Sequence, residues 1–170
     1  MPVPDHVTIR PAVPADAEAL AHLHLDVWDD AYTGLVPRGI LDDRRERVAE
    51  RVARWEDILA RRELPGEEER TWVAEDDGGL IGFAATGPAR DNDVDDLLEL
   101  YSLYVRASYW DRGVGYGLFD TAVADRGAYL WVLAGNERAI RFYERQGFRL
   151  DGTEDEQDEG VHVRMVRYGR

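Results

Sequence analysis

The sequence predicts a mixed α/β fold in which helices flank a central β-sheet. Several segments carry apolar residues at helical spacing, short β-branched or aromatic runs lie between them, and the second half alternates strand with helix. At 170 residues the chain can bury one sizeable core, and no repeat or low-complexity tract divides it. We therefore expect a single domain over residues 1–170.

The N-terminal third is expected to hold a short strand and two amphipathic helices. The strand covers residues 7–10 and ends at a proline. Apolar residues recur three and four positions apart over 17–28 and again over 48–59, which predicts a helix at each place. The Arg and Glu residues between the apolar positions of the second helix are expected to form a solvated face. Residues 63–70, rich in glutamate and containing Pro-Gly, are predicted as a loop.

A hairpin and a central strand are predicted in the middle of the chain. Runs of β-branched and aromatic residues at 71–75 and 80–86 flank Asp-Asp-Gly-Gly at 76–79, which is a hairpin signal. An acidic loop follows at 87–96. Residues 97–105 are then nearly all apolar, which predicts a strand covered on both faces.

The C-terminal part is expected to complete the sheet. A helix with an apolar face over 114–123 leads to a strand at 128–133, which should run parallel to the central strand. Residues 136–146 form another amphipathic helix. The last two strands are expected at 148–150 and 161–168, with an acidic turn at 151–160 between them.

The composition excludes several classes of enzyme. The chain has no cysteine, which removes disulfides, thiolate zinc sites and cysteine nucleophiles. Every one of its 21 basic residues is arginine. Because phosphate-loop nucleotidases and Schiff-base enzymes need a lysine, both classes are excluded as well.

Charge and hydropathy limit the partners and the location. A formal net charge of -14 disfavours nucleic acid, because such binding depends on clustered cations. The same charge would attract a cationic substrate, although a surface adapted to solubility or salt explains it equally. No apolar run is long enough to span a membrane, and the N-terminus lacks a secretory pattern. We therefore expect a cytoplasmic protein that binds neither nucleic acid nor membrane.

The first chemical signal is the turn Arg112-Gly113-Val114-Gly115-Tyr116-Gly117, which follows the central strand and opens a helix. Glycines allow backbone N–H groups to approach an anion, and the helix N-terminus adds a favourable dipole, so a phosphate or pyrophosphate is the expected ligand. A tight turn could also need these glycines for structural reasons alone. A dinucleotide-binding turn is disfavoured, because its third glycine would fall at Leu118 and no acidic residue ends the next strand.

A second signal lies in the helix that runs from Asn136 to Gly147 and is followed by Phe148. Asn136 can be explained as a helix N-cap, Tyr143 as a packing residue and Gly147 as a C-cap. These explanations do not account for the glycine turn about twenty residues upstream in the same strand-helix-strand-helix order.

Together the glycine turn and the pattern N-x-x-A-x-x-F-Y-x-x-x-G-F resemble the two acetyl-CoA motifs of the GNAT superfamily of N-acetyltransferases. The opening Ile9-Arg10-Pro11-Ala12 with Asp16 resembles the usual start of that family. The likeness spans nearly the whole chain and implies a GNAT-type central mixed β-sheet flanked by helices. The chain departs from the pattern at Trp110, where Gln or Arg is usual, and at Ala107, which replaces a common proline.

The resemblance implies an acyltransferase that moves the acetyl group of acetyl-CoA directly to a primary amine of a small molecule or protein, with no metal and no covalent intermediate. The implied partners are acetyl-CoA and an amine, which the acidic composition suggests is cationic; assembly into a homodimer is left open. Two alternatives also stay open. One is a catalytically reduced acyl-CoA-binding sensor or interaction module, and the other is an acyltransferase for a longer acyl-CoA.

The same resemblance implies three groups of cofactor contacts. The pantetheine arm would pair, as an added strand would, with the backbone of Leu103, Tyr104 and Val105. The pyrophosphate would lie against Asp111, Arg112, Gly113, Val114, Gly115 and Tyr116. Asn136 and Tyr143 would lie along the cofactor.

Two residues are candidates for acid-base chemistry. Glu99 lies where several family members carry a glutamate that deprotonates the amine, and its apolar strand predicts a raised pKa. The alternative for Glu99 is a pair with an arginine. Tyr143 is the family's candidate general acid for the leaving thiolate, and the alternative is a packing role that phenylalanine would also fill.

Overall fold

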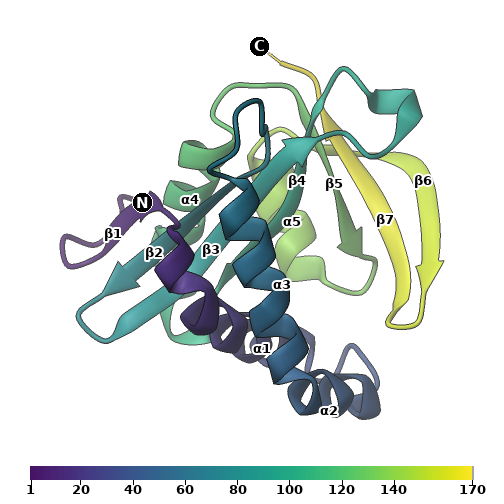
Figure 1. Ribbon diagram of the computed structural model, residues 1–170. Coiled ribbons are helices and arrows are strands. Elements are labelled where there is room, and N and C mark those ends of the chain that lie inside the picture. The colour runs from purple at the N-terminus through teal and green to yellow at the C-terminus, as the bar shows by residue number, and fades with distance from the viewer. Residues whose placement is uncertain (170) are drawn as a thin grey trace.

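The computed structural model describes residues 1–169 and contains a seven-stranded mixed sheet with helices on both faces (Figure 1). The strand order is β1-β2-β3-β4-β5-β7-β6. Every neighbouring pair is antiparallel except β4 and β5, which are parallel. The strands are β1 (Thr8–Pro11), β2 (Arg70–Asp76), β3 (Gly79–Pro88), β4 (Leu98–Val105), β5 (Ala128–Leu133), β6 (Arg149–Gln157) and β7 (Gly160–Arg167). The mixed α/β class predicted from the sequence is confirmed.

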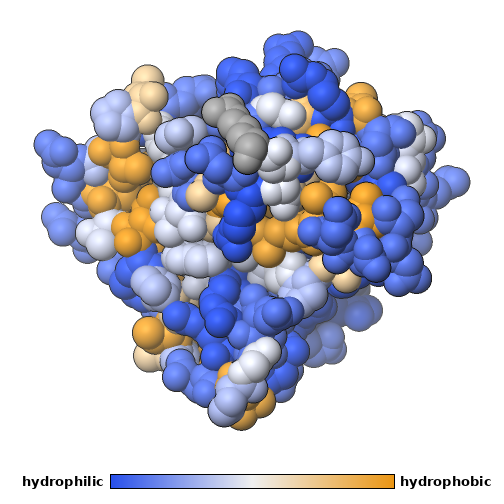
Figure 2. Space-filling view, turned by 90° about the horizontal axis from the view of Figure 1, so that it is seen from above, coloured by the Kyte–Doolittle hydropathy of each residue, from blue (hydrophilic) through white to orange (hydrophobic). Residues whose placement is uncertain are grey.

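Residues 1–169 also contain five α-helices. They are α1 (Ala17–Tyr32), α2 (Arg38–Glu46), α3 (Val48–Arg61), α4 (Val114–Ala122) and α5 (Glu137–Arg145). In the view of Figure 1, α1 and α3 lie in front of the sheet and α4 and α5 behind it. None of the helices among residues 1–169 is long and apolar enough to cross a membrane. The face seen in Figure 2 is mostly hydrophilic, with apolar residues in separate patches.

The two faces of the sheet build separate cores, because side chains alternate along each strand. Val73 and Phe83 face α1 and α3, where they pack with Leu20 and Leu59. On the other face, a core that includes residues of α4, α5, β5 and β7 packs under the glycine turn. The family resemblance implied a sheet flanked by helices, and this arrangement is confirmed.

The structure differs from the prediction at two elements. The helix α2 was not predicted, because Leu41 is its one buried residue and its sequence has almost no apolar periodicity. The acidic stretch predicted as a turn at 151–160 is mostly strand, since β6 extends to Gln157 and only Asp158 and Glu159 separate it from β7. An edge strand that is exposed along nearly its whole length can carry acidic residues without cost.

The parallel strands β4 and β5 pair only at their beginnings. Leu98 is in register with Ala128, and Glu99 with Tyr129, and the pairing stops there. The prediction that β4 is covered on both faces is therefore wrong for its second half. Residues 101–105 are only partly buried, because a gap opens beside them.

Candidate functional site

The gap between β4 and β5 exposes backbone groups of β4. The N–H of Arg106 donates to the Ile81 carbonyl of β3, so the alternation of a strand turns the backbone groups of Tyr104 toward β3 as well. Those of Leu103 and Val105 face the gap instead. Of the three residues implied to meet the pantetheine arm, Leu103 and Val105 therefore fit. The prediction is wrong for the backbone of Tyr104, whose side chain lies on the face of the sheet that α1 and α3 cover.

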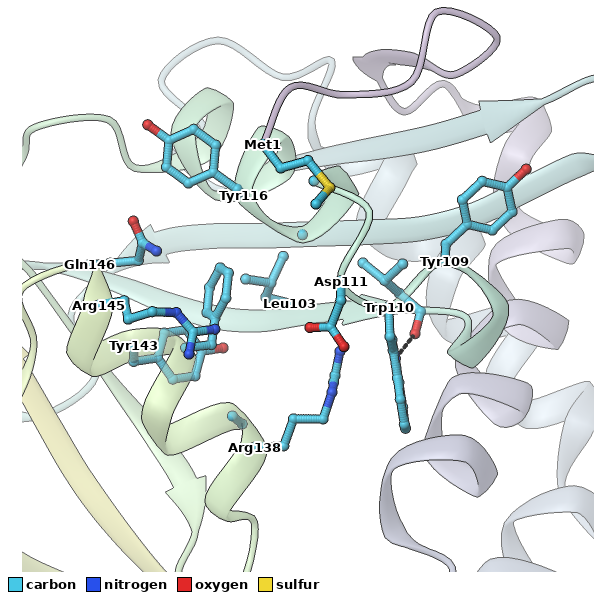
Figure 3. Close-up of a pocket in the computed structure, with 15 residues that line it drawn as sticks. Met1, Leu103, Tyr109, Trp110, Asp111, Tyr116, Arg138, Tyr143, Arg145 and Gln146 are labelled. Carbon is cyan, nitrogen blue, oxygen red and sulfur yellow. Dashed lines mark hydrogen bonds between the residues drawn. The ribbon is translucent and has the colours of Figure 1, made fainter.

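A cleft of about 390 Å³ opens from this gap toward the glycine turn (Figure 3). We call it the glycine-turn cleft. Seven of the predicted site residues line it: Leu103, Val105, Asp111, Gly113, Gly115, Tyr116 and Tyr143. Figure 3 shows Arg138, Tyr143 and Arg145 on the α5 side of the cleft, with Trp110 and Asp111 facing them.

The glycine turn leaves room for a ligand at Gly115 and none at Gly113. Gly113 caps α4 with φ of 83°, and a Cβ there would lie 2.5 Å from the Pro2 carbonyl oxygen. A Cβ on Gly115 would meet nothing closer than 3.8 Å. The first hydrogen bond of α4 runs from the Gly117 N–H to the Gly113 carbonyl. The N–H groups of residues 114–116 therefore have no acceptor within the helix and can bind an anion.

Trp110 forms a hydrogen bond with one of the backbone carbonyl groups at the gap. Its indole Nε1 donates to the Val105 carbonyl oxygen at 2.8 Å, so this oxygen is already bonded. The Arg138 guanidinium stacks on the same indole, with 3.8 Å from Cζ to the ring centroid. An arginine from α5 thus reaches the cleft beside the position where the family usually has Gln or Arg.

Sequence reasoning missed Arg138 and Arg145, which both line the glycine-turn cleft. They are seven residues apart and, with Phe142, follow the i, i+4, i+7 spacing of one side of α5, so helical spacing could have found them. Burial lowers the pKa of Arg138, and Asp111 opposes this shift. The two arginines give the cleft positive charge in a chain whose net charge is -14.

Besides Tyr104, three residues predicted to bind the cofactor do not line the glycine-turn cleft. The Val114 side chain is fully buried in the core, so only its backbone N–H can serve a ligand. Arg112 lies near the Tyr109 ring, 5.9 Å from Cζ to the centroid, and does not line the cleft. Asn136 caps α5 by accepting from the Ala139 N–H, and its side chain lines the adjoining gap between β4 and β5.

Tyr143 lines both the glycine-turn cleft and the gap. Its side chain is buried, with 7% of the residue exposed, and burial raises its pKa. No group among residues 1–169 forms a hydrogen bond with its hydroxyl. A buried hydroxyl that faces a cleft without a protein partner is free to bind a ligand atom.

Glu99 is held by an arginine and a tyrosine. Its Oε1 accepts from Arg90 at 2.7 Å, and its Oε2 accepts from the Tyr129 hydroxyl at 2.7 Å and the Arg90 backbone N–H at 3.0 Å. Burial alone would raise the pKa of Glu99, but the hydrogen bonds from Arg90 and Tyr129 outweigh it and hold the pKa below its usual value. The predicted raised pKa is wrong, and the arginine pair that we considered as the alternative is present.

A second cleft, of about 470 Å³, opens on the face of α1 and α3. We call it the arginine cleft, after Arg44, Arg51, Arg54 and Arg90, which line it. Tyr101, Ser102 and Tyr104 of β4 line both this cleft and the gap. The solvated face predicted for α3 is therefore wrong at Arg51, which is partly buried in the cleft. Among residues 1–169 no cluster of His, Asp or Glu could hold a metal.

Known proteins resemble this chain over most of its length. A family model described as an acetyltransferase (GNAT) domain matches residues 67–150. A probable N-acetyltransferase of Mycobacterium tuberculosis is 28% identical over 88% of this chain and 83% of its own. An uncharacterized N-acetyltransferase of Bacillus subtilis is 26% identical over 96% of this chain and 92% of its own.

Two solved structures share the fold. The PaiA N-acetyltransferase of Thermoplasma acidophilum, in complex with coenzyme A, superposes with a TM-score of 0.75 at 20% identity, covering 95% of this chain and 99% of its own. Arabidopsis thaliana NAA60, in complex with a bisubstrate analogue, gives a TM-score of 0.65 at 22% identity, covering 95% of this chain and 97% of its own.

The ion pair of Glu99 leads to a prediction about stability. Because the folded pKa of Glu99 lies below its ordinary value of 4.5, its contribution is present above that value and is lost as the pH falls through the folded pKa. Glu99→Gln should lower the free energy of unfolding by about 1–3 kcal/mol at pH 7, and the difference should shrink toward pH 3.5. Urea denaturation of both proteins across this range measures it.

Glu137→Gln is the matched control, because Glu137 forms an exposed pair with Arg141 and should change stability by less than about 0.5 kcal/mol. A Glu99→Gln difference that stays constant with pH would contradict the ionised pair.

Proposed function

Because the chain belongs to the GNAT superfamily of N-acetyltransferases, we propose that it transfers the acetyl group of acetyl-CoA directly to a primary amine. One observation carries this proposal. The gap between β4 and β5 shares Leu103, Val105 and Tyr143 with the glycine-turn cleft, and Tyr101, Ser102 and Tyr104 with the arginine cleft. A thioester entering from one cleft and an amine entering from the other would therefore meet in the gap.

The glycine-turn cleft fits acetyl-CoA by its donors and its charge. The free N–H groups of residues 114–116 would bind the pyrophosphate, with Arg138 and Arg145 adding positive charge. The backbone of Leu103, together with the N–H of Val105, would pair with the pantetheine amides. The bound thioester supplies an activated acetyl group, and the protein residues orient it at the gap.

Tyr143 is our candidate general acid. Its hydroxyl faces the cleft without a protein partner, and a raised pKa keeps it protonated at neutral pH. A phenol within reach of the departing sulfur could donate its proton or stabilise the thiolate.

We assign Glu99 the role of positioning Arg90. Its two oxygens already accept from Arg90 and Tyr129, and its lowered pKa makes it a weak base. The same ion pair holds Arg90 at the edge of the arginine cleft, with its guanidinium 4.2 Å from the Tyr101 ring centroid. The role of general base implied by the family stays a prediction, which the variant below tests.

A sensor that binds acyl-CoA without turnover is the alternative, and the engaged state of Glu99 is the observation that favours it. Thiol release measured with acetyl-, propionyl- and succinyl-CoA against a panel of amines distinguishes the two. Release with any amine supports the enzyme, and the acyl group that is used fastest identifies the donor.

Acetyl-CoA should stabilise the folded chain by about 2.7 kcal/mol at a hundredfold excess over its Kd. Gly115→Glu places a negative charge where the pyrophosphate would bind, so thermal melting of this variant should show no shift with acetyl-CoA. Gly115→Ala is the control, because its Cβ makes only ordinary contacts and should leave most of the shift. A full shift in Gly115→Glu would refute the assignment of the glycine turn.

Tyr143→Phe should lower kcat by about 10²–10⁴-fold, the usual loss when a general acid is removed. Its melting temperature and acetyl-CoA affinity should change little, because the hydroxyl has no protein partner. Tyr168→Phe, at a residue that is 72% exposed, controls for the substitution itself. An unchanged kcat, measured where chemistry limits turnover, would return Tyr143 to a packing role.

Glu99→Gln separates positioning from general-base catalysis. A positioning role predicts a higher KM for the amine, a kcat within about threefold of the parent and an unchanged acid limb in the pH profile of kcat. Loss of a general base would instead lower kcat by about 10²–10⁴-fold and remove that limb. Steady-state kinetics from pH 6 to 9 measures both, and the second result would overturn our assignment.

A further inference from the structure

The arginine cleft concentrates positive charge in an acidic protein. Four arginines line it, and Glu69 is the only acidic residue among its described lining residues. Arg90 is paired with Glu99. Arg44, Arg51 and Arg54 form no ion pair with any carboxylate among residues 1–169, although the sequence has 35 acidic residues. The cleft therefore holds three arginines that have no carboxylate within ion-pair distance, although Glu159 acts on Arg44 from farther away.

Several donors of these arginines are buried without a hydrogen-bond partner. They are Nε and one terminal nitrogen of Arg44 and Nε of Arg51. Leaving a charged donor buried and unsatisfied costs several kcal/mol in general, so such groups normally find an acceptor. Here the acceptor must come from outside the chain.

Aromatic contacts hold the two arginines in place. The Arg44 guanidinium lies over the Trp28 ring, 3.5 Å from Cζ to the centroid. Arg51 donates to the Nδ1 atom of His24 at 3.3 Å. Burial lowers the pKa of His24 well below its usual value, and the nearby arginines add to this, so His24 stays neutral and leaves their charge intact.

Both arginines remain cationic at neutral pH. Burial and the neighbouring Arg51 lower the pKa of Arg44 to about 10. Burial and Arg54 lower the pKa of Arg51 as well. Mutual repulsion of this kind is relieved by an anion bound between the guanidinium groups.

We propose that the acceptor amine carries an anionic group, a carboxylate or a phosphate, which binds to Arg44 and Arg51 in the arginine cleft. This inference rests on the proposed acetyl transfer. The aromatic walls at Trp28, Trp55 and Tyr101 would cover the apolar part of the acceptor. The amine would then extend past Tyr104 into the gap, because that residue lines both spaces.

The net charge of the chain predicts the opposite preference, for a cationic acceptor. That prediction concerns the long-range field, which salt screens over about 8 Å at physiological strength. Contacts inside a partly desolvated cleft are screened much less, so the local arginines should decide which acceptor binds.

Matched pairs of amines test the proposal. Tyrosine and tyramine differ by a carboxylate, and O-phosphoethanolamine and ethanolamine differ by a phosphate. With acetyl-CoA saturating, kcat/KM from thiol release should favour the anionic member of each pair that is used, by about 10–100-fold. The preference should fall toward unity in Arg44→Gln and Arg51→Gln and persist in the control Arg38→Gln, an exposed residue of α2 paired with Asp42.

Folding of the variants is checked by melting. Removing a partly buried cation that has no carboxylate partner should leave the melting temperature unchanged or raise it. Equal use of both members of each pair, or a preference for tyramine or spermidine, would overturn the inference while the acetyltransferase activity stands. A rise in the KM for acetyl-CoA, with no change in acceptor preference, would also overturn it.

A binding measurement separates this inference from the proposed function. Calorimetry with N-acetyltyrosine and N-acetyltyramine, the two products, needs no turnover. The carboxylate should bind at least about tenfold more tightly, and Arg51→Gln should remove the difference. If thiol release fails with every amine but this difference is present, the proposed enzyme activity fails and the anion site stands; equal binding of the two products overturns the anion site.

Discussion

The site depends on one feature of the sheet, which is that β4 and β5 pair at two register positions and then diverge. Because of this divergence, Leu103 and Val105 have backbone groups that no strand satisfies, and a gap connects the two faces of the sheet. The base of the gap is fixed where Glu99 and Tyr129 lie in register and share a hydrogen bond. The Tyr129 hydroxyl also accepts from the N–H groups of Arg90 and Asp91, so the loop after β3 is tied to the same point.

A second network of ion pairs connects that loop to β7, which lies two strands from β4 in the sheet. Arg164 of β7, whose side chain is 5% exposed, bridges the carboxylates of Asp91, Asp93 and Asp151. Buried ion pairs contribute little net stability but fix geometry strongly, because breaking one leaves a charge without compensation. Arg90 is therefore held between two anchored neighbours, Glu99 and Asp91. The polar loop thus contributes Arg90 to the arginine cleft and holds it in place.

The sequence was sufficient to predict those features that depend on a local pattern of residues. Helical spacing predicted α1, α3 and α5, and the glycine turn predicted the N–H groups at 114–116. Features that depend on distant partners were missed: the pKa direction of Glu99 is decided by Arg90 and Tyr129, and the course of β6 by pairing with β7. Arg51 was predicted on a solvated helix face and Arg44 lay in no predicted element, because nothing in the local sequence shows that His24 and Trp28 contact them.

The distribution of charge explains why composition misleads about the ligand. Acidic residues outnumber arginines. Outside the two clefts, arginines form ion pairs with carboxylates, such as Arg10 with Asp16 and Arg45 with Asp29. Pairing removes those arginines from ligand binding, whereas Arg138 and Arg51 lie in clefts where aromatic side chains, not carboxylates, are their closest partners. Since a desolvated charge acts more strongly than an exposed one, a few cleft arginines can outweigh the net charge of -14. An anion at each cleft is therefore the arrangement that this charge distribution favours.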